Sequence, residues 1–337
     1  MRFKFINILC ILFLLISFIG VTTAVEEFTS DSVIEYNSRF TEEYEALSNE
    51  EKEQIRDREN KFFEKYTFNV TTTTVVHSSA TFEKSGVAYQ NVTVETIYKS
   101  NDGKFEKEFG TNTVSSSESY TVKEDVDEFF FENQMFSLKS LNENEIVVTE
   151  TEQIILVPAS TPHEWWNDGY AYPPYLYKKR ILGVFGDYTE REDPVNLIWK
   201  NTNANTVRST LISRSGWVAL NDGLLSEYPY AVYDRNRQWV TPLSVGETQQ
   251  RRNGGYHVRI YQLSDGSVVG GAHEDSAILS DYGITHKVVN LEYAEYVVCN
   301  YFYNAGWRVQ QNSQRLNNSG TFGAGATNNG NATVITR

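Results

Sequence analysis

The chain has 337 residues, a net charge of −14 and a pI near 4.9. This charge argues against nucleic acids, whose phosphates would be repelled, and against electrostatic docking on an anionic membrane surface. Apolar residues make up 40% of the chain, so its length is sufficient for two ordinary domains with hydrophobic cores.

The first 24 residues have the features of a secretory signal peptide. Arg2 and Lys4 form a basic start, residues 5–21 are apolar, and small residues precede a cleavage site after Ala24. The alternative is an uncleaved membrane anchor, because the apolar run is near the lower length limit for a membrane span. In both cases we expect an extracytoplasmic protein, either secreted or held at the cell surface. A membrane contact is expected only through such an anchor.

Cysteine usage and glycosylation motifs agree with this compartment. Removal of residues 1–24 takes Cys10 away and leaves Cys299, so we expect no internal disulfide. Cys299 follows two valines within a predicted helix, which favours a small core residue over a nucleophile. Motifs for N-glycosylation predict a glycoprotein if the host glycosylates, although short motifs also arise by chance in an Asn-rich chain. They lie at Asn69, Asn91, Asn317 and Asn331.

The amino-terminal half is predicted to contain a helical segment followed by a β-sheet module. Residues 25–65 are charged, and from Ser30 onward they lack Gly and Pro and place apolar residues at helical spacing. Residues 66–158 alternate Thr, Val, Tyr and Phe, which is typical of antiparallel strands such as 92–97 and 146–157. His77 in this module is expected to be structural or exposed.

Residues 159–180 form a junction rich in proline and aromatic residues. Trp165 and Trp166 are its candidate binding residues, because exposed aromatic rings stack on sugars. The alternative is that this segment packs across a domain seam, since large aromatic side chains are mostly buried.

Residues 181–310 are predicted to form an α+β layer domain, and residues 311–337 a disordered tail. The tail consists mostly of Asn, Gly, Ala, Thr and Ser, with Phe322 as its only aromatic residue. The fold class is thus α+β, with the helical segment, the antiparallel module and then this domain. Gly-Trp pairs predict that both of its helices end in a Schellman motif. Its predicted elements are strand 194–199, helix 206–215, hairpin 256–276, strand 285–289 and a helix that starts at the Asn290 cap.

The hairpin 256–276 is the organising element of this domain. Asp265-Gly266 between runs of Val, Ile and Tyr predicts a two-residue type I′ turn. A two-residue loop sets the register, in which His257 lies opposite Glu274. Because directly opposed residues share a face, this register places a polar group of His257, Arg259 and Glu274 on one side.

The predicted register also decides which residues share a ligand. Glu274 is expected to pair with the Arg259 guanidinium and to favour the protonated form of His257. His257 and His273 then point to opposite faces, so one metal ion cannot use both. A bulge at Gly270-Gly271 is the alternative that would bring them together.

No complete catalytic or metal-binding signature is present in the chain. Neither a nucleophile elbow nor a nucleotide-binding loop occurs, so no cofactor is expected. No metal is predicted either, although His273, Asp275 and His286 form a ligand set that is conceivable from residue type. Asp275 follows His273 by two residues, so both side chains leave the same strand face.

Short motifs between residues 187 and 307 resemble the LssY C-terminal domain family. They are Asp193–Leu197, Ser215–Trp217, Tyr256–Tyr261, Gly271–His273 and Thr285–Lys287. That family is often joined to membrane domains similar to phosphatidic-acid phosphatases, so the resemblance implies a cell-envelope setting near lipids or lipid-linked sugars. It implies no catalytic residues. The chain departs from the family at Arg251-Arg252, which three residues and Tyr256 separate from His257.

Two function classes follow from these observations. The first is a binding or accessory module whose partner is a cell-surface glycan or an envelope protein. The alternative is a hydrolase for an envelope phosphoryl or ester group, with Arg259 or Arg252 holding the anion and His257 or His286 acting as base. Because no catalytic signature is complete, we predict the module.

Overall fold

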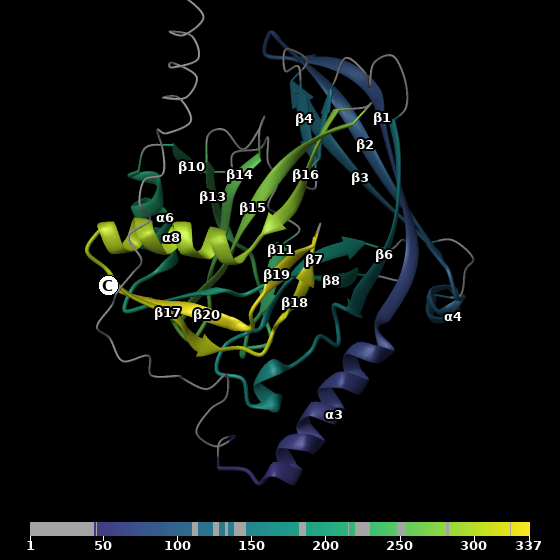
Figure 1. Ribbon diagram of the computed structural model, residues 1–337. Coiled ribbons are helices and arrows are strands. Elements are labelled where there is room, and N and C mark those ends of the chain that lie inside the picture. The colour runs from purple at the N-terminus through teal and green to yellow at the C-terminus, as the bar shows by residue number, and fades with distance from the viewer. Residues whose placement is uncertain are drawn as a thin grey trace, which may run out of the picture. The chain divides into compact units, whose positions relative to one another are not determined.

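The computed structural model describes residues 44, 46–109, 114–123, 128–131, 134–137, 146–181, 187–214, 216–219, 230–247, 254–280, 283–323 and 325–337. They all fall within the compact unit Glu35–Arg337. The fold is α+β, as predicted, with helices and mostly antiparallel sheets (Figure 1). The predicted signal peptide lies outside the described residues. None of the described helices has the length and apolar character that spanning a bilayer requires.

The first large sheet has eight strands, and it unites the amino-terminal strands with strands from the middle of the chain. Its β6 confirms the strand predicted at 146–157, and β2 contains the one predicted at 92–97. Its order is β12 (Trp239–Val240), β11 (Tyr230–Tyr233), β7 (Tyr175–Ile181), β8 (Asp187–Pro194), β6 (Ile146–Pro158), β1 (Thr67–Lys84), β2 (Val87–Ser100) and β3 (Val114–Lys123).

The second large sheet is built around the predicted hairpin, β14 and β15. Its main path is β10 (Trp217–Ala219), β13 (Leu243–Glu247), β14 (Gly254–Gln262), β15 (Val268–Ser280), β16 (Gly283–Asn290), β5 (Gln134–Ser137) and β4 (Glu128–Phe131). The first residues of β15 pair with β9 (Leu197–Lys200), which is followed in the sheet by β20 (Asn331–Thr336) and β17 (Arg308–Arg315). A separate pair is β18 (Gly320–Phe322) with β19 (Ala326–Asn328). The strand predicted at 285–289 is confirmed within β16.

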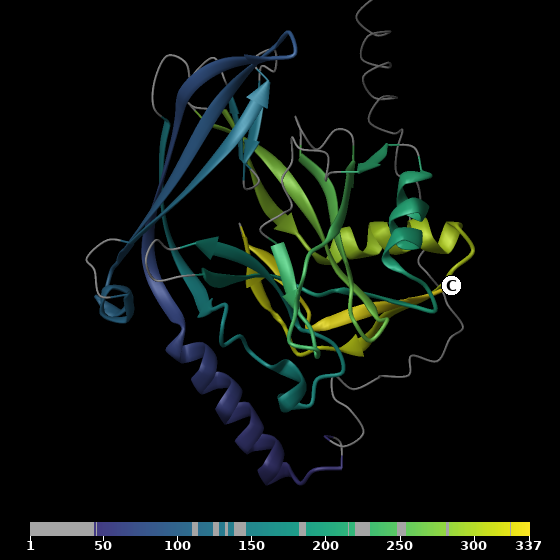
Figure 2. The ribbon, with the colours of Figure 1, turned by 180° about the vertical axis from the view of Figure 1, so that it is seen from behind.

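Both sheets cross the boundaries predicted at 158 and 181. β6 pairs with β8, and β5 pairs with β16, so strands of the predicted β module belong to the same sheets as later strands. Figure 2 shows the two groups of strands from behind. Local composition changes at these boundaries, but sheet pairing is decided by which edges meet in three dimensions.

The prediction of a disordered tail at 311–337 is wrong. β20 lies inside the sheet, parallel to β9 and antiparallel to β17. Val334 and Ile335 are 1% and 0% exposed, and they belong to the hydrophobic cores on opposite faces. The four buried residues 332–335, which include Thr333, are surrounded by polar residues, and their partner strand β9 lies more than 130 residues away in the sequence.

The helices are α3 (Asn49–Lys65), α4 (Lys104–Phe109), η1 (Trp165–Asp168), α6 (Ala204–Ile212) and α8 (Glu292–Asn304). α8 ends as predicted. Trp307 N–H donates to Phe302 O at 3.0 Å, Gly306 N–H donates to Tyr303 O at 2.9 Å, and Gly306 has φ +85°. The Phe302 and Trp307 rings are 5.0 Å apart, which completes the Schellman motif. At the other end, Asn290 Oδ1 accepts from Tyr293 N–H at 3.0 Å, which confirms its capping role.

Two boundary predictions nearby are wrong. α6 stops at Ile212 with Ser213 as C-cap, so Gly216 is too far along to form its Schellman motif. The strand predicted at 194–199 is interrupted, because β8 ends at Pro194 and β9 begins at Leu197. At the break, Asn196 bonds to the backbone N–H and C=O of Ala272, at 2.8 and 2.9 Å. A buried asparagine with both groups paired holds this bend against β15.

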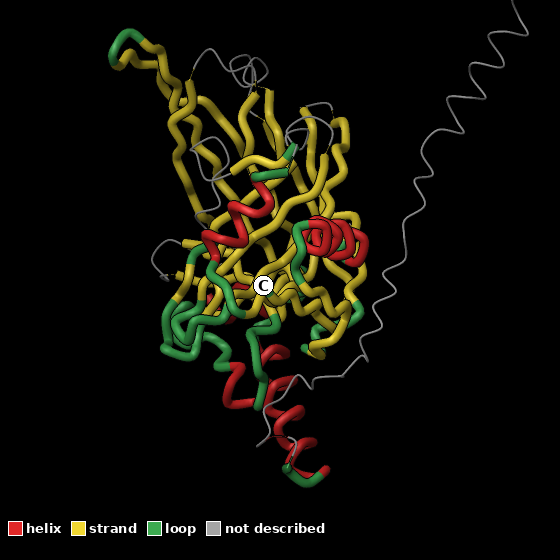
Figure 3. Tube along the Cα trace, turned by 90° about the vertical axis from the view of Figure 1, so that its left-hand side faces the viewer, coloured by secondary structure: helices red, strands yellow, loops and turns green. Residues whose placement is uncertain are grey.

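The second sheet separates two cores. α6 and α8 cover one face, where Ala204, Val207, Ala294 and Phe302 pack on strand residues that include Val258. Cys299 lies in this core with 0% exposure, as predicted. The opposite face carries a second core with contributions from β7 and β11 of the first sheet. Figure 3 shows α6 and α8 in red beside the strands.

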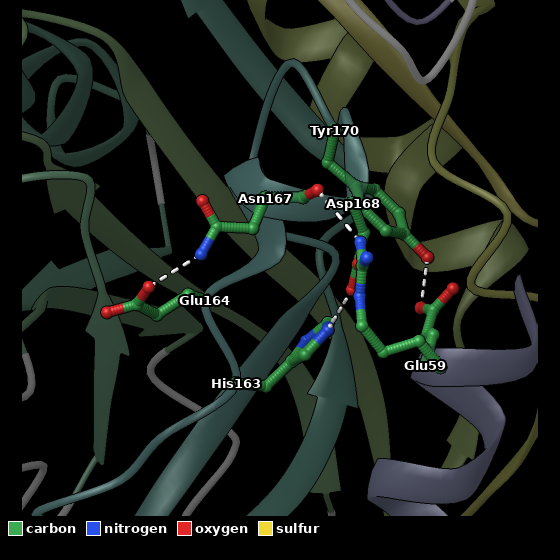
Figure 4. Close-up of polar contacts among 7 residues, drawn as sticks. Glu59, His163, Glu164, Asn167, Asp168 and Tyr170 are labelled. Atoms are coloured by element: carbon green, nitrogen blue, oxygen red, sulfur yellow. Dashed lines mark hydrogen bonds and ion pairs between the residues drawn. The ribbon is translucent and has the colours of Figure 1, made fainter. Parts of the chain in front are cut away.

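α3 confirms the predicted amino-terminal helix over residues 49–65 and is attached by a polar latch (Figure 4). The latch consists of Arg58 and Glu59 from α3 with His163, Asp168 and Tyr170 from the junction. Asp168 accepts from Arg58 Nε at 3.1 Å and bonds with His163 Nε2 at 2.7 Å. Tyr170 O–H donates to Glu59. The junction is thus a packing seam, in agreement with one of the two alternatives.

Candidate functional site

The hairpin has a three-residue loop, not the predicted two-residue turn. Leu263 N–H donates to Ser267 O at 2.8 Å, and Gly266 N–H donates to Leu263 O at 3.1 Å. Gly266 has φ +88°, as a type I turn followed by a G1 bulge requires. An Asp-Gly pair suits this loop as well as the two-residue one, so the sequence did not distinguish them.

The extra loop residue shifts the register by one position. His257 lies opposite His273, and Arg259 lies opposite Gly271. A one-residue shift moves side chains to the other face. The predicted separation of His257 from His273 is therefore wrong, and no bulge at Gly270-Gly271 is needed to bring them together.

His257, Arg259, His273 and Asp275 consequently share one face of β14 and β15. The His257 and His273 rings are 4.9 Å apart between centroids and nearly perpendicular, at 83°. Asp275 Oδ2 lies 3.5 Å from His273 Nε2, as expected for residues that leave the same strand face. Glu274 lies on the opposite face, so the predicted Glu274–Arg259 pair is wrong.

The carboxylate partner of Arg259 is Asp193, from the end of β8. Arg259 Nη1 donates to Asp193 Oδ2 at 2.7 Å, and His273 Nδ1 bonds with the same oxygen at 3.1 Å. The Arg259 guanidinium also lies over the Tyr230 ring, 3.7 Å from its centroid. These five residues, His257, Arg259, His273, Asp275 and Asp193, are called the polar centre.

The polar centre is enclosed by the protein. His257, Arg259 and His273 are each 1% exposed, Asp275 is 3% exposed and Asp193 is 6% exposed. Burial of ionisable groups is costly unless they are paired, and here two carboxylates face a guanidinium and imidazoles.

The charges of the polar centre shift one another's pKa. Burial by itself would lower the pKa of His273, but Asp275 and Asp193 outweigh it and raise that pKa to about 9. Burial would raise the pKa of Asp193, but His273 and Arg259 hold it below the ordinary value. The two carboxylates thus stabilise the protonated form of His273.

A glycine allows the two sheets to approach at this centre. A Cβ added at Gly271 would lie 2.7 Å from Leu176 Cδ1 and 3.1 Å from Pro194 O. Both neighbours come from the first sheet, next to Asp193. The absence of a side chain at Gly271 therefore lets the Asp193 carboxylate reach Arg259 and His273.

The other sequence-predicted residues are not part of the centre as described. His286 pairs with Ala277 through β16, but its side chain lies outside the described part of the structure. Arg252 lies outside the described residues. Trp165 is 2% exposed and donates its indole N–H to Tyr233 O at 2.7 Å, while Trp166 stacks on the Tyr233 ring. Trp165 therefore packs inside the seam and is not an exposed sugar platform.

Sequence reasoning missed Asp193 as a site residue. Asp193 belongs to the Asp193–Leu197 motif, but its neighbours in the sequence do not indicate which distant residue its carboxylate contacts. Its contacts with β14 and β15 span 66 and 80 positions in the sequence.

A second feature is a stripe of aromatic side chains on the outer side of α8. Tyr293 and Tyr303 are 46% and 56% exposed. The Tyr293 and Tyr296 rings stack at 6.0 Å with an interplanar angle of 23°, and Tyr256 of β14 lies 6.2 Å from Tyr293. These four residues are called the tyrosine face. It offers exposed aromatic rings where the predicted Trp165 platform does not.

Comparison with family models, curated proteins and solved structures found no match for this chain. The resemblance of residues 187–307 to the LssY C-terminal domain stays a prediction. The function must therefore be inferred from the residues and contacts of the chain itself.

Proposed function

We propose that this protein is an extracytoplasmic, non-enzymatic binding module that holds a neutral cell-surface glycan on the tyrosine face of α8. The observation that carries the proposal is the exposure of Tyr293 and Tyr303 on α8, together with the stacking of the Tyr293 and Tyr296 rings. The amino-terminal signal and the resemblance to the LssY C-terminal domain support an envelope setting.

The chemistry of tyrosine supports a saccharide partner. Each ring offers an apolar face for the C–H groups of a sugar, and its hydroxyl offers a hydrogen bond at the rim. Tyrosine is also one of the residue types that most often carry the binding energy of an interface. The net charge of −14 opposes polyanionic ligands, so an uncharged glycan fits best.

The geometry of the polar centre supports a non-enzymatic role. In a hydrolase, Arg259 would hold the substrate anion, yet here its guanidinium pairs with Asp193 and covers the Tyr230 ring. His257, one of the two predicted bases, is 1% exposed. A general base must reach the proton that it removes, directly or through one water. The side chains of the polar centre therefore bind one another and do not face solvent, where a substrate would arrive.

A binding titration with matched variants tests the glycan proposal. Soluble neutral hexasaccharides of glucose, mannose and N-acetylglucosamine would be titrated into the protein and followed by saturation-transfer NMR and calorimetry. We expect one of them to bind, and Tyr293→Ala with Tyr303→Ala to weaken it by about tenfold or more, since an aromatic contact contributes about 0.5–1.5 kcal/mol beyond its buried area. Ile212→Ala, at an apolar position on α6 that is 39% exposed, serves as control and should bind normally.

Two results would overturn this function. If the wild-type protein binds none of the three sugar classes, or if the double variant binds as tightly as wild type, the tyrosine face is not a glycan site. Hydrolysis of p-nitrophenyl phosphate, bis(p-nitrophenyl) phosphate or p-nitrophenyl acetate by the wild type, with loss of turnover in His257→Ala, would establish the hydrolase instead.

A further inference from the structure

We propose that His257, His273 and Asp275 bind one divalent first-row transition-metal ion of the zinc class inside the fold. This inference goes beyond glycan binding and does not depend on it. The starting observation is that ligand atoms of these three residues all lie within 4.8 Å of one another. The corrected hairpin register is what brings them together, because it pairs His257 with His273 across β14 and β15.

The spacing of the donors suits a shared ion. Ligands at about 2.0–2.2 Å from a tetrahedral zinc ion lie about 3.3–3.6 Å from one another. His273 Nε2 and Asp275 Oδ2 are 3.5 Å apart, which is already one edge of such a tetrahedron. The His257 and His273 rings are 4.9 Å apart between centroids, and a ring nitrogen of His257 lies within 4.8 Å of the other two ligand atoms.

His273 shows a second feature of a metal ligand. Its Nε2 is buried and lies 3.5 Å from Asp275 Oδ2 without a well-aligned hydrogen bond, while its Nδ1 bonds with Asp193. Metal-binding histidines commonly bond their other ring nitrogen to a carboxylate, which sets the ring orientation and makes the metal-facing nitrogen more basic. Asp193 is therefore assigned as the positioning residue that directs His273 Nε2 at the ion.

The donor types select the class of ion. Two imidazole nitrogens and one carboxylate oxygen suit zinc, cobalt, nickel, copper and iron, whereas magnesium and calcium prefer sites made of oxygen. Three protein ligands leave a coordination position for a water or a small anion. Since the residues are 1–3% exposed, the ion would act chiefly as a link that joins β14 to β15 and, through Asp193, to β8.

Metal binding by the full-length, untagged protein tests the assignment. After removal of metal with a chelator and dialysis, Zn²⁺ would be titrated by calorimetry, and Co²⁺ by its visible absorption. We expect one ion per chain, with the intense bands of four-coordinate Co²⁺, and no uptake of Mg²⁺ or Ca²⁺ at the same concentration. Zinc should also raise the midpoint of thermal unfolding, because an ion that binds only the folded state stabilises it.

Variants separate the ligands from the positioning residue. His257→Ala and Asp275→Asn should abolish Zn²⁺ binding in the same range, and Asp193→Asn should weaken it by about 10- to 100-fold while leaving the Co²⁺ bands recognisable. His77→Ala, on β1, is the matched control and should bind normally. Circular dichroism identifies any variant that fails to fold, and then the Co²⁺ spectrum of the wild type alone still decides the question.

The outcomes are distinct from those of the proposed function. A folded wild-type chain that binds neither Zn²⁺ nor Co²⁺, or ligand variants that bind as wild type does, would overturn the metal site. A chain that binds zinc but no glycan keeps this inference and loses the proposed function. A zinc-loaded chain that hydrolyses esters keeps the metal site and replaces the non-enzymatic role.

Discussion

Removal of the C-terminal strand is the sharpest test of the fold. A chain that ends at Gly330 lacks β20, which fills the gap between β9 and β17. Burial of Val334 and Ile335 contributes about 1.5–3 kcal/mol for each side chain. The hydrogen bonds lost along both edges of β20 add about 0.5–1.5 kcal/mol each.

These losses together approach the total stability of an ordinary domain, about 5–15 kcal/mol. We therefore expect the truncated chain not to reach the native state. Because truncation gives an all-or-none result, Ile335→Ala provides the graded version and should cost about 2–5 kcal/mol through loss of burial and creation of a cavity.

Urea unfolding followed by tryptophan fluorescence measures both changes. Thr327→Ala is the control, because Thr327 is exposed in the same C-terminal segment and should change stability by less than about 0.5 kcal/mol. If the chain that ends at Gly330 unfolds at the urea midpoint of the full chain, β20 does not belong to the sheet and the original prediction of a disordered tail is restored.

Four further predictions concern individual residues. Gly271→Ala should lower the free energy of unfolding by about 1–3 kcal/mol, because its Cβ would lie 2.7 Å from a leucine of β7; an unchanged urea midpoint would argue against the close approach of the sheets. Gly306→Ala should cost about 1–2 kcal/mol, because φ +85° strains any residue with a Cβ, and thermal unfolding measures it. His257→Ala and His273→Ala should show a coupling of about 0.5–3 kcal/mol in a double-mutant cycle, whereas additive effects would restore the separate faces. Burial would raise the pKa of Asp168, but hydrogen bonds from His163 and Arg58 in the latch hold this pKa below the ordinary value. The carboxylate therefore stabilises the fold fully above the ordinary pKa, and this stabilisation is lost as the pH falls through the lowered pKa. In Asp168→Asn, the free energy of unfolding should consequently depend less on pH on the acid side.

Features that depend on neighbours in the sequence were predictable. The apolar spacing, the Asn290 cap and the Gly306-Trp307 end predict α8, because the contacts that these features make join residues only a few positions apart. The burial of Cys299 followed from the same spacing. The existence of the hairpin was also predictable, since Asp-Gly between β-branched runs favours a turn locally.

The loop length of that hairpin could not be decided locally. A two-residue and a three-residue loop both accommodate Asp265-Gly266. The free-energy difference between the two loops is smaller than the free energy gained by packing the two faces of the hairpin. Only the three-residue loop places Val268 and Ala272 of β15 on the same face as Val258 and Ile260 of β14, under α6 and α8. The same register places Val269 beside Tyr261 in the second core. Burial on both faces therefore selects the register.

By itself, the sequence determined the α+β class, α8 with its two ends, and the presence of β14, β15 and β16. The tertiary structure decided the strand order, the inclusion of β20 and the composition of the polar centre. Asp193 meets Arg259 and His273 because two sheets approach at Gly271, and the Asp193–His273 contact joins residues 80 positions apart. Short-range hydrogen bonds and side-chain spacing leave a pattern in the sequence, whereas the meeting of two sheet faces depends on the packing of the whole chain.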